Sequence, residues 1–157
     1  MININISIST MTADDIDEAV QVDSENLSPW AASHFKNQLQ QKYSWQFVAR
    51  STQSQNLIGY ICGQSLADEG EIHKIAVAKA FRRQHVGHRL LDHALAFQES
   101  SGTLSCFLEL RASNKPAQQL YNSFGFRPCG LRKKYYTSPQ EDAIIMRLQQ
   151  QQSISAP

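Results

Sequence analysis

A cationic turn at residues 82–89 holds the first side chains whose types and spacing could do chemistry. It reads RRQHVGHR and places Arg82, Arg83 and Arg89 around Gly87. Apolar residues recur after it at helical spacing, so we expect the turn to open a helix. The first N–H groups of a helix have no intrahelical partner and carry partial positive charge, so they attract anions. The turn therefore predicts an anion site, and a solvated basic helix start is the alternative.

A single carboxylate interrupts the apolar run LSCFLEL at residues 104–110. We expect this run to form a central strand covered on both faces, where an unpaired carboxylate is costly. Glu109 is therefore a candidate general base, and a structural ion pair with Arg111 or Lys115 is the alternative. Cys106 in the same run is expected to be inert core packing.

Tyr121 occupies the apolar stripe of the helix that follows, which Asn114 can cap. The stripe also holds Ala117, Leu120 and Phe124 at helical spacing. From this position alone, the favoured interpretation of Tyr121 is a core aromatic whose hydroxyl reaches a polar partner.

Hydrophobic periodicity predicts one α/β domain over residues 1–148, followed by a polar, disordered tail over residues 149–157. The expected strands lie near residues 2–9 (with Ile2, Ile4 and Ile6 on one face), 45–50, 57–66, 71–77, 104–110, 126–136 and 142–148. The expected helices lie near residues 12–24, 35–39, 86–100 and 114–124. Short connections between several consecutive strands predict a mixed sheet that is largely antiparallel.

The composition fits a cytoplasmic globular domain. The chain has 157 residues, of which 41% are hydrophobic and 18% charged, enough for one core without disulfides or a metal. A formal net charge of +1 argues against direct binding of nucleic acid through phosphate electrostatics. Three widely spaced cysteines fit reduced thiols in a cytoplasm. The histidines form no metal motif and no apolar run is long enough to span a membrane, so we expect neither a metal nor a membrane partner.

Three motifs taken together resemble those of the GCN5-related N-acetyltransferase (GNAT) superfamily over most of the chain. They are IAV at residues 75–77, RRQHVGHRLL at 82–91 and LELRASNKPAQQLYNSFGF at 108–126. Within the superfamily, the chain is most similar to the RimI-type ribosomal-protein-alanine N-acetyltransferases of bacteria, through SPW at 28–30, KKYY at 133–136 and EDAIIM at 141–146. The resemblance implies a single-domain GNAT fold, in which a mixed, mostly antiparallel sheet is flanked by helices.

The resemblance also implies that acetyl-CoA is the co-substrate. The backbone of Ile75, Ala76 and Val77 would hold the pantetheine arm and the acetyl group, and Asn114 would contact more of the coenzyme. The turn would hold the pyrophosphate through Arg82, Arg83, Gln84, His85, Val86, Gly87 and His88. One position departs from the family, because His85 stands where its loop has the first glycine. The His85 ring either points outward or pairs with phosphate, and we expect weaker coenzyme binding at most, since several N–H donors share the anion.

By the same resemblance, Glu109 accepts the proton of the attacking amine and Tyr121 donates a proton to the leaving thiolate. The amine attacks the thioester directly, without an acyl-enzyme. The implied acceptor is the N-terminal alanine of the small-subunit ribosomal protein S18. Two alternatives stay open: a lysine side chain or a small-molecule amine as the acceptor, and a non-catalytic coenzyme-A-binding module that associates with the ribosome.

The resemblance places Trp30, Tyr135 and Tyr136 around the acceptor N-terminus. The two tyrosines could equally be aromatic strand residues beside a basic edge. Glu141 and Asp142 could accept hydrogen bonds from a basic peptide, or they could be solvated loop charges. We take Asp142, with the three aromatic residues, as the candidate acceptor-binding group.

Overall fold

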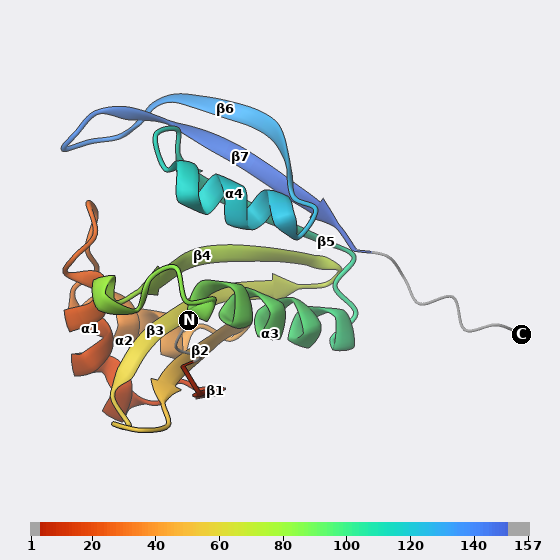
Figure 1. Ribbon diagram of the computed structural model, residues 1–157. Helices are drawn as coiled ribbons and strands as arrows, with labels where there is room; N and C mark the ends of the chain where they lie inside the picture. Colours follow the sequence, from red (N-terminus) through yellow and green to blue (C-terminus); the bar gives the residue numbers. More distant parts are fainter. Residues whose placement is uncertain (1–3, 151–157) are drawn as a thin grey trace, which may run out of the picture.

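The computed structural model describes residues 4–150 and places seven strands in one sheet (Figure 1). The strands are β1 (Ile6–Thr10), β2 (Ser44–Ser51), β3 (Leu57–Leu66), β4 (Glu69–Val77), β5 (Ser105–Arg111), β6 (Arg127–Tyr136) and β7 (Glu141–Gln149). Their spatial order is β1-β2-β3-β4-β5-β7-β6. The predicted mixed, mostly antiparallel sheet is confirmed. The predicted strand residue Ile2 and residues 151–157 of the predicted tail lie outside the described residues.

Four helices flank the sheet within residues 4–150: α1 (Ile16–Asp23), α2 (Ala32–Gln40), α3 (Val86–Ser100) and α4 (Lys115–Ser123). Two 3₁₀ turns, η1 (Ala13–Asp15) and η2 (Lys79–Phe81), precede α1 and α3. The Asp15 carboxylate accepts a hydrogen bond from the Thr12 backbone N–H at 2.8 Å, which starts the first helical segment. Gly102 and Gly125 follow α3 and α4 with φ of +88° and +98°, a left-handed conformation that glycine adopts at helix ends. The predicted order of helices and strands is therefore confirmed.

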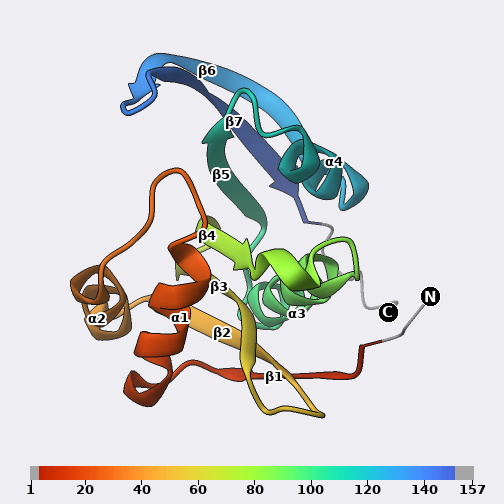
Figure 2. The ribbon, with the colours of Figure 1, turned by 60° about the vertical axis from the view of Figure 1, so that its left-hand side comes forward.

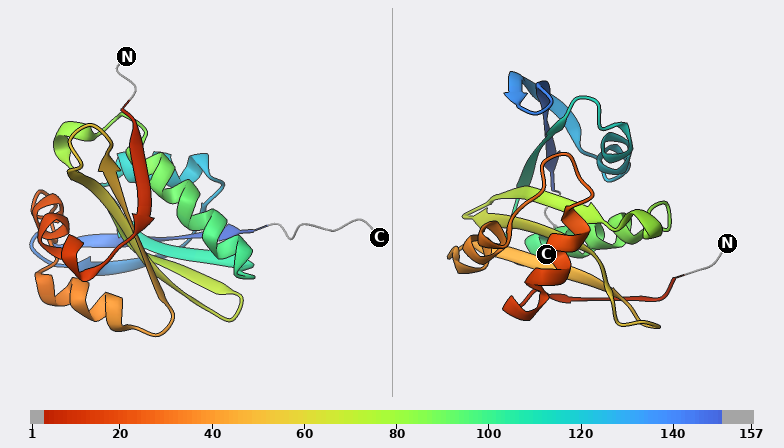
Figure 3. Two further views of the ribbon diagram at one scale, coloured as in Figure 1. Left: turned by 90° about the horizontal axis from the view of Figure 1, so that it is seen from below. Right: turned by 90° about the vertical axis from the view of Figure 1, so that its left-hand side faces the viewer.

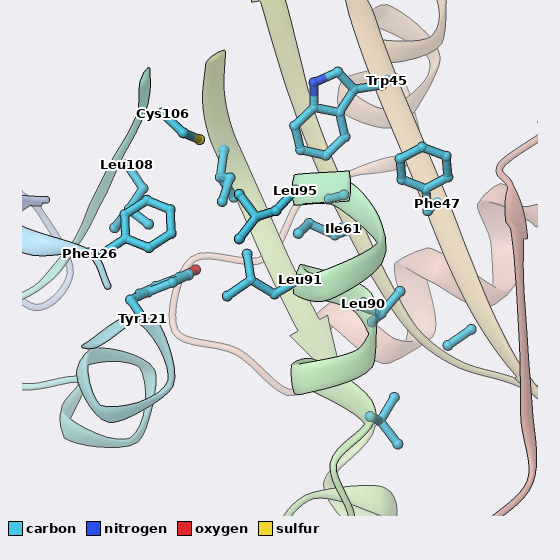
Figure 4. Packing of buried hydrophobic residues seen from close by; sticks show 14 of the residues in the cluster. Trp45, Phe47, Ile61, Leu90, Leu91, Leu95, Cys106, Leu108, Tyr121 and Phe126 are labelled. Atoms are coloured by element: carbon cyan, nitrogen blue, oxygen red, sulfur yellow. The ribbon is translucent and has the colours of Figure 1, made fainter. Parts of the chain in front are cut away.

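The sheet separates two hydrophobic clusters. One contains buried residues of α3, such as Leu91, together with Tyr121 of α4 (Figure 4). The other contains residues of α1 and α2, such as Phe35. Successive residues of β3 alternate between them, since Tyr60 belongs to the second cluster and Ile61 to the first. Figures 2 and 3 accordingly show α1 and α2 on one face of the sheet and α3 on the other.

β4 and β5 are parallel neighbours that pair over only part of their length. The register runs from Glu69↔Ser105 to Ile72↔Leu108, and both strands continue beyond the last pair. On its other edge, β4 keeps pairing with β3, with a register shift that leaves His73 without a β3 partner. The two strands therefore diverge at the centre of the sheet.

The prediction that β5 is covered on both faces is wrong. Cys106 and Leu108 are buried in the cluster with α3 and α4, whereas Phe107 and Glu109 on the other face are half-buried. α1 and α2 pack on β2, β3 and β4, so they leave this face of β5 open. The guanidinium of Arg147 lies 5.5 Å from the centre of the Phe107 ring. A polar side chain at position 109 therefore does not have to enter a closed core.

Candidate active site

A cavity of about 480 Å³ opens where β4 and β5 diverge. Its wall comes from the α1–α2 loop (residues 24–31), the middle of β4, the end of β5, α4 with the residues just before it, and the last residue of β6. The lining residues that bear on chemistry are Ser28, Trp30, His73, Lys74, Ile75, Glu109, Arg111, Asn114, Tyr121 and Tyr136. Both candidate catalytic residues thus border one cavity, together with part of the candidate coenzyme and acceptor sets.

Glu109 lies just beyond the last pair between β4 and β5. Its Oε1 accepts from Nε of Arg132 at 2.8 Å, and 24% of its side chain is exposed. An ion pair is therefore present, as in the alternative interpretation of Glu109, but its partner is Arg132 rather than Arg111 or Lys115. The carboxylate also borders a second cavity of about 330 Å³. Glu109 remains accessible to an incoming amine while an exposed guanidinium balances its charge.

Tyr121 reaches the cavity from the other face of β5. It is 5% exposed, its ring centre lies 5.5 Å from that of Phe126, and its hydroxyl points away from α4 towards Leu91 (Figure 4). Burial raises the pKa of Tyr121, so the phenol keeps its proton at neutral pH. The side chain is thus a core aromatic that also lines the cavity.

The cationic turn opens α3 as predicted. The helix begins at Val86, with His85 at the N-cap position. Helix geometry therefore leaves the N–H groups of Val86, Gly87 and His88 without intrahelical acceptors. A Cβ added at Gly87 would make only ordinary van der Waals contacts, the nearest at 3.5 Å from Leu120. Packing among the described residues does not require glycine here, whereas a ligand close to the backbone would.

His85 adopts the backbone conformation that favours glycine at its position. Its φ is +64°, in the left-handed region where a Cβ costs about 1 kcal/mol. Histidine enters this region more often than most residues do. The His85 ring centre lies 6.3 Å from that of His88, which packs 4.6 Å from the ring centre of Phe124. The backbone at His85 therefore keeps the left-handed conformation that glycine adopts most readily, although the residue is a histidine.

Two polar side chains anchor the turn. Arg82 donates from Nε to the Val77 carbonyl at 3.1 Å and from Nη2 to Oδ1 of Asn26 at 3.4 Å. Gln84 donates from Nε2 to the Ala80 carbonyl at 3.2 Å. The turn is thus fixed to the end of β4 and to the α1–α2 loop.

The end of β4 has one paired and one unpaired edge. Ile75, Ala76 and Val77 pair with β3, but they lie beyond the last pair with β5. Backbone groups on that edge that have no partner are available to a ligand, whereas the Val77 carbonyl already accepts from Arg82. Asn114 caps α4, because its Oδ1 accepts from a backbone N–H in the first turn at 3.2 Å, and it also lines the cavity.

Of the candidate acceptor-binding residues, Trp30 and Tyr136 line the cavity and Tyr135 and Asp142 do not. Tyr135 is 51% exposed, and side-chain hydrogen bonding to Glu109, with the charge of that carboxylate, raises its pKa. Burial raises the pKa of Tyr136. Asp142 accepts from a backbone N–H of β6 at 2.8 Å, so it braces the β6–β7 hairpin.

A buried ion pair that was not predicted from the sequence lies beneath the α1–α2 loop. Asp23 is fully buried and accepts from Nζ of Lys74 at 2.7 Å and from the Trp30 N–H at 2.6 Å. Lys74 Nζ also donates to the Ser28 carbonyl at 2.5 Å and lies 5.1 Å from the Trp30 ring centre. One signal was available: Asp23 continues the helical spacing of Ile16 and the apolar residues after it, where a carboxylate needs a buried partner.

Cysteine and metal-binding side chains are the remaining groups that could do chemistry. Cys106 is fully buried, and burial raises the pKa of its thiol to about 12, so it is a poor nucleophile. Among residues 4–150, no group of three or more His, Cys, Asp or Glu side chains is arranged to hold a metal ion. Over the same part of the chain, no helix has the length and apolar character needed to cross a membrane.

The chain matches known acetyltransferases in sequence and in structure. The model of the acetyltransferase (GNAT) family matches residues 13–126. An uncharacterized protein of Mycobacterium leprae is 37% identical over 93% of this chain, which spans 41% of the length of that relative. The ribosomal protein bS18-alanine N-acetyltransferase of Escherichia coli is 33% identical over 90% of this chain and 96% of its own length.

The fold agrees with these sequence matches. The crystal structure of the ribosomal-protein-S18-alanine N-acetyltransferase from Escherichia coli superimposes with a TM-score of 0.84 and 32% identity, over 92% of this chain and 94% of that one. The two chains thus share one fold over most of their length. The chain belongs to the GNAT acetyltransferase family.

Proposed function

We propose that the protein transfers the acetyl group of acetyl-CoA to the N-terminal alanine of ribosomal protein bS18. The observation that carries the proposal is the single cavity bordered by Glu109, Tyr121 and the unpaired edge of β4. The acceptor is proposed from the names of relatives that match this chain over nine-tenths of its length.

The coenzyme is proposed to bind along the α3 side of the site. The N–H groups of Val86, Gly87 and His88 would hold the pyrophosphate, supported by the positive end of the helix dipole. The free backbone edge at Ile75 and Val77 would bind the extended pantetheine arm. The contacts of Gly87 support this placement, because a Cβ there would meet only ordinary van der Waals neighbours and packing does not explain the glycine.

Glu109 is proposed as the proton acceptor. An α-amino group has a pKa of about 8, so much of it is protonated at neutral pH and only the neutral form can attack a thioester. A carboxylate within reach of the amine can take the proton as the new N–C bond forms. The Arg132 guanidinium that pairs with Glu109 is exposed enough to move when the amine arrives.

Tyr121 is proposed to protonate the leaving sulfur. A free thiol has a pKa of about 8.5, below that of a phenol. Burial raises the pKa of Tyr121, and the same apolar surroundings would raise the pKa of a thiol held beside it. The two groups would therefore stay close enough in acidity for a hydrogen bond and proton transfer as charge develops on sulfur.

The proposed compartment is the cytoplasm. Cys62, Cys106 and Cys129 are all free thiols, and reduced cysteines are typical of cytoplasmic proteins. The proposed acceptor, a ribosomal protein, is made there.

Mass spectrometry of two peptides tests the function. One peptide has the N-terminal sequence of bS18 with a free α-amine, and the other is identical except that the α-amine is blocked and its lysines are free. We expect acetyl transfer only to the first peptide. Transfer to the blocked peptide would move the acceptor to lysine, and no transfer to either, despite acetyl-CoA binding, would favour a non-catalytic module.

A further inference from the structure

Arg111, at the end of β5, holds together segments that are far apart in the sequence. It is 8% exposed. Its Nη2 donates to Oγ of Ser28 in the α1–α2 loop at 2.9 Å. Its Nη1 donates to the Pro139 carbonyl at 3.0 Å, in the turn between β6 and β7 (residues 137–140). One side chain therefore connects both loops to the central sheet.

Further contacts fix the orientation of this guanidinium. Glu141, the first residue of β7, forms an ion pair with Nη1 at 3.3 Å. The other oxygen of Glu141 accepts from the Ser113 N–H, just before α4, at 2.6 Å. The guanidinium carbon lies 4.5 Å from the ring centre of Tyr136. The planar arginine fork suits this arrangement, which a lysine ammonium could not reproduce.

The α1–α2 loop is held from a second side. While Arg111 binds the hydroxyl of Ser28, Lys74 binds its carbonyl at 2.5 Å. Lys74 is in turn fixed by the buried carboxylate of Asp23. Ser28 itself is exposed, so these two cations, rather than core packing, set the position of this part of the loop.

We propose that Arg111 is a positioning residue for the acceptor: it holds the α1–α2 loop and the β6–β7 turn at a fixed separation beside the reacting centre. Trp30, in the α1–α2 loop, and Tyr136, the residue directly before the β6–β7 turn, line the cavity with Arg111 itself. This inference rests on the proposed function, because it concerns the binding of the acceptor peptide. Arg111 does not act on the reacting atoms but on the segments that orient the peptide.

The kinetic test uses Arg111→Lys in the full chain, with the bS18 N-terminal peptide as acceptor. We expect KM for the peptide to rise by about tenfold, since small displacements of positioning groups carry penalties of this size or larger. Kd for acetyl-CoA should stay the same, because the hydrogen bonds of Arg111 go to Ser28, to the β6–β7 turn and to Glu141, and not to the turn before α3. Arg147→Lys is the matched control, since Arg147 is exposed on β7 and donates to Gln149. An unchanged peptide KM in Arg111→Lys would overturn the proposal.

Ser28→Ala removes one of the arginine's hydrogen bonds from an exposed loop, and it carries the test if Arg111→Lys does not fold. We expect a smaller rise in peptide KM from Ser28→Ala alone and no additional rise when it is combined with Arg111→Lys. Fully additive effects, or no effect of Ser28→Ala on KM, would contradict a shared role.

Hydrogen exchange separates this inference from the proposed function. In Arg111→Lys, the amides of residues 24–31 and 137–140 should exchange faster while those of α3 keep their protection. This readout needs no acceptor, so it tests the positioning role even if the wild-type protein acetylates neither peptide. Unchanged exchange in both loops would refute the inference, whatever the activity.

Discussion

The two sides of the cavity differ in the groups that form them: backbone groups on one side and charged side chains on the other. On the α3 side, the groups available to a ligand are backbone N–H groups and a strand edge, and helix and strand geometry sets their positions. On the other side, the α1–α2 loop and the β6–β7 hairpin are held by charged side chains. The ion pairs there are Asp23–Lys74, Arg111–Glu141 and Glu109–Arg132.

This difference determines which changes each side tolerates. A backbone donor survives a change of its own side chain, and the loop at His85 keeps a glycine-type path without the glycine. An ion pair is lost with one substitution, and a buried one leaves an uncompensated charge behind. We therefore expect the α3 side to be sensitive mainly to added bulk and the acceptor side to be sensitive to loss of charge.

The largest expected effect follows removal of the candidate base. Glu109→Gln should lower kcat/KM by about 100-fold or more, in the range typical for general bases, with Kd for acetyl-CoA unchanged. Initial rates and calorimetric titration measure the two quantities. Glu71→Gln is the matched control, because this exposed carboxylate on β4 borders only the second cavity. If Glu109→Gln instead loses coenzyme binding, Glu109 is a structural residue.

Removal of the buried charge of Asp23, on the acceptor side, should have the next largest effect, and the quantity affected is stability. Asp23→Asn should lower the free energy of unfolding by about 3 kcal/mol, because Lys74 would lose its partner beneath the α1–α2 loop. Urea denaturation measures the change. Asp17→Asn, on the exposed part of the same helix, should have almost no effect. Equal effects of the two substitutions would mean that the ion pair contributes no net stability.

A methyl group added on the α3 side should weaken coenzyme binding without lowering the stability of the fold. Gly87→Ala should leave the fold unharmed or slightly more stable, because the methyl group meets only ordinary contacts and alanine favours helix. Acetyl-CoA should bind about tenfold more weakly, equal to about 1.4 kcal/mol, because the Cβ would occupy the approach of the pyrophosphate. Thermal denaturation and titration test both halves. Unchanged affinity would place the phosphates elsewhere.

The smallest effect is expected at His85, which stands where the family loop has a glycine. His85→Gly relieves left-handed strain of about 1 kcal/mol, but it increases the backbone freedom of the unfolded chain by a similar amount. Stability should therefore change by less than about 1 kcal/mol, and acetyl-CoA affinity should be kept. A clear loss of affinity in the same titration would show that the His85 ring itself contacts the coenzyme.

Periodicity and end signals in the sequence were sufficient for most of the fold. The apolar runs of β2 and β3, the stripe of α3 and the glycines at 102 and 125 each depend on neighbours within a few residues. The open face of β5 was not predictable in this way. An apolar strand looks the same whether a helix covers one face or two, and only the packing of α1 and α2 against β2, β3 and β4 decides it.

The candidate site was also only partly predictable from the sequence. Glu109 and Tyr121 were found from their motifs, and both border the cavity, although their chemical roles stay predictions. The partners of the charged residues were not found, because they lie far along the chain: Asp23 with Lys74, and Arg111 with Ser28 and Glu141. No local pattern relates such residues until the sheet brings them together.

The divergence of β4 and β5 also bears on how the molecule unfolds. Register pairs between these strands stop at Ile72↔Leu108, so β1–β4 and β5–β7 share few of the hydrogen bonds that make a sheet cooperative. An extended ligand seated along the free edge of β4 would continue the interrupted ladder and tie the two halves together. Such a ligand would then hold the two halves of the sheet together. We expect the bound protein to unfold as one unit, whereas the free protein should open first between β4 and β5.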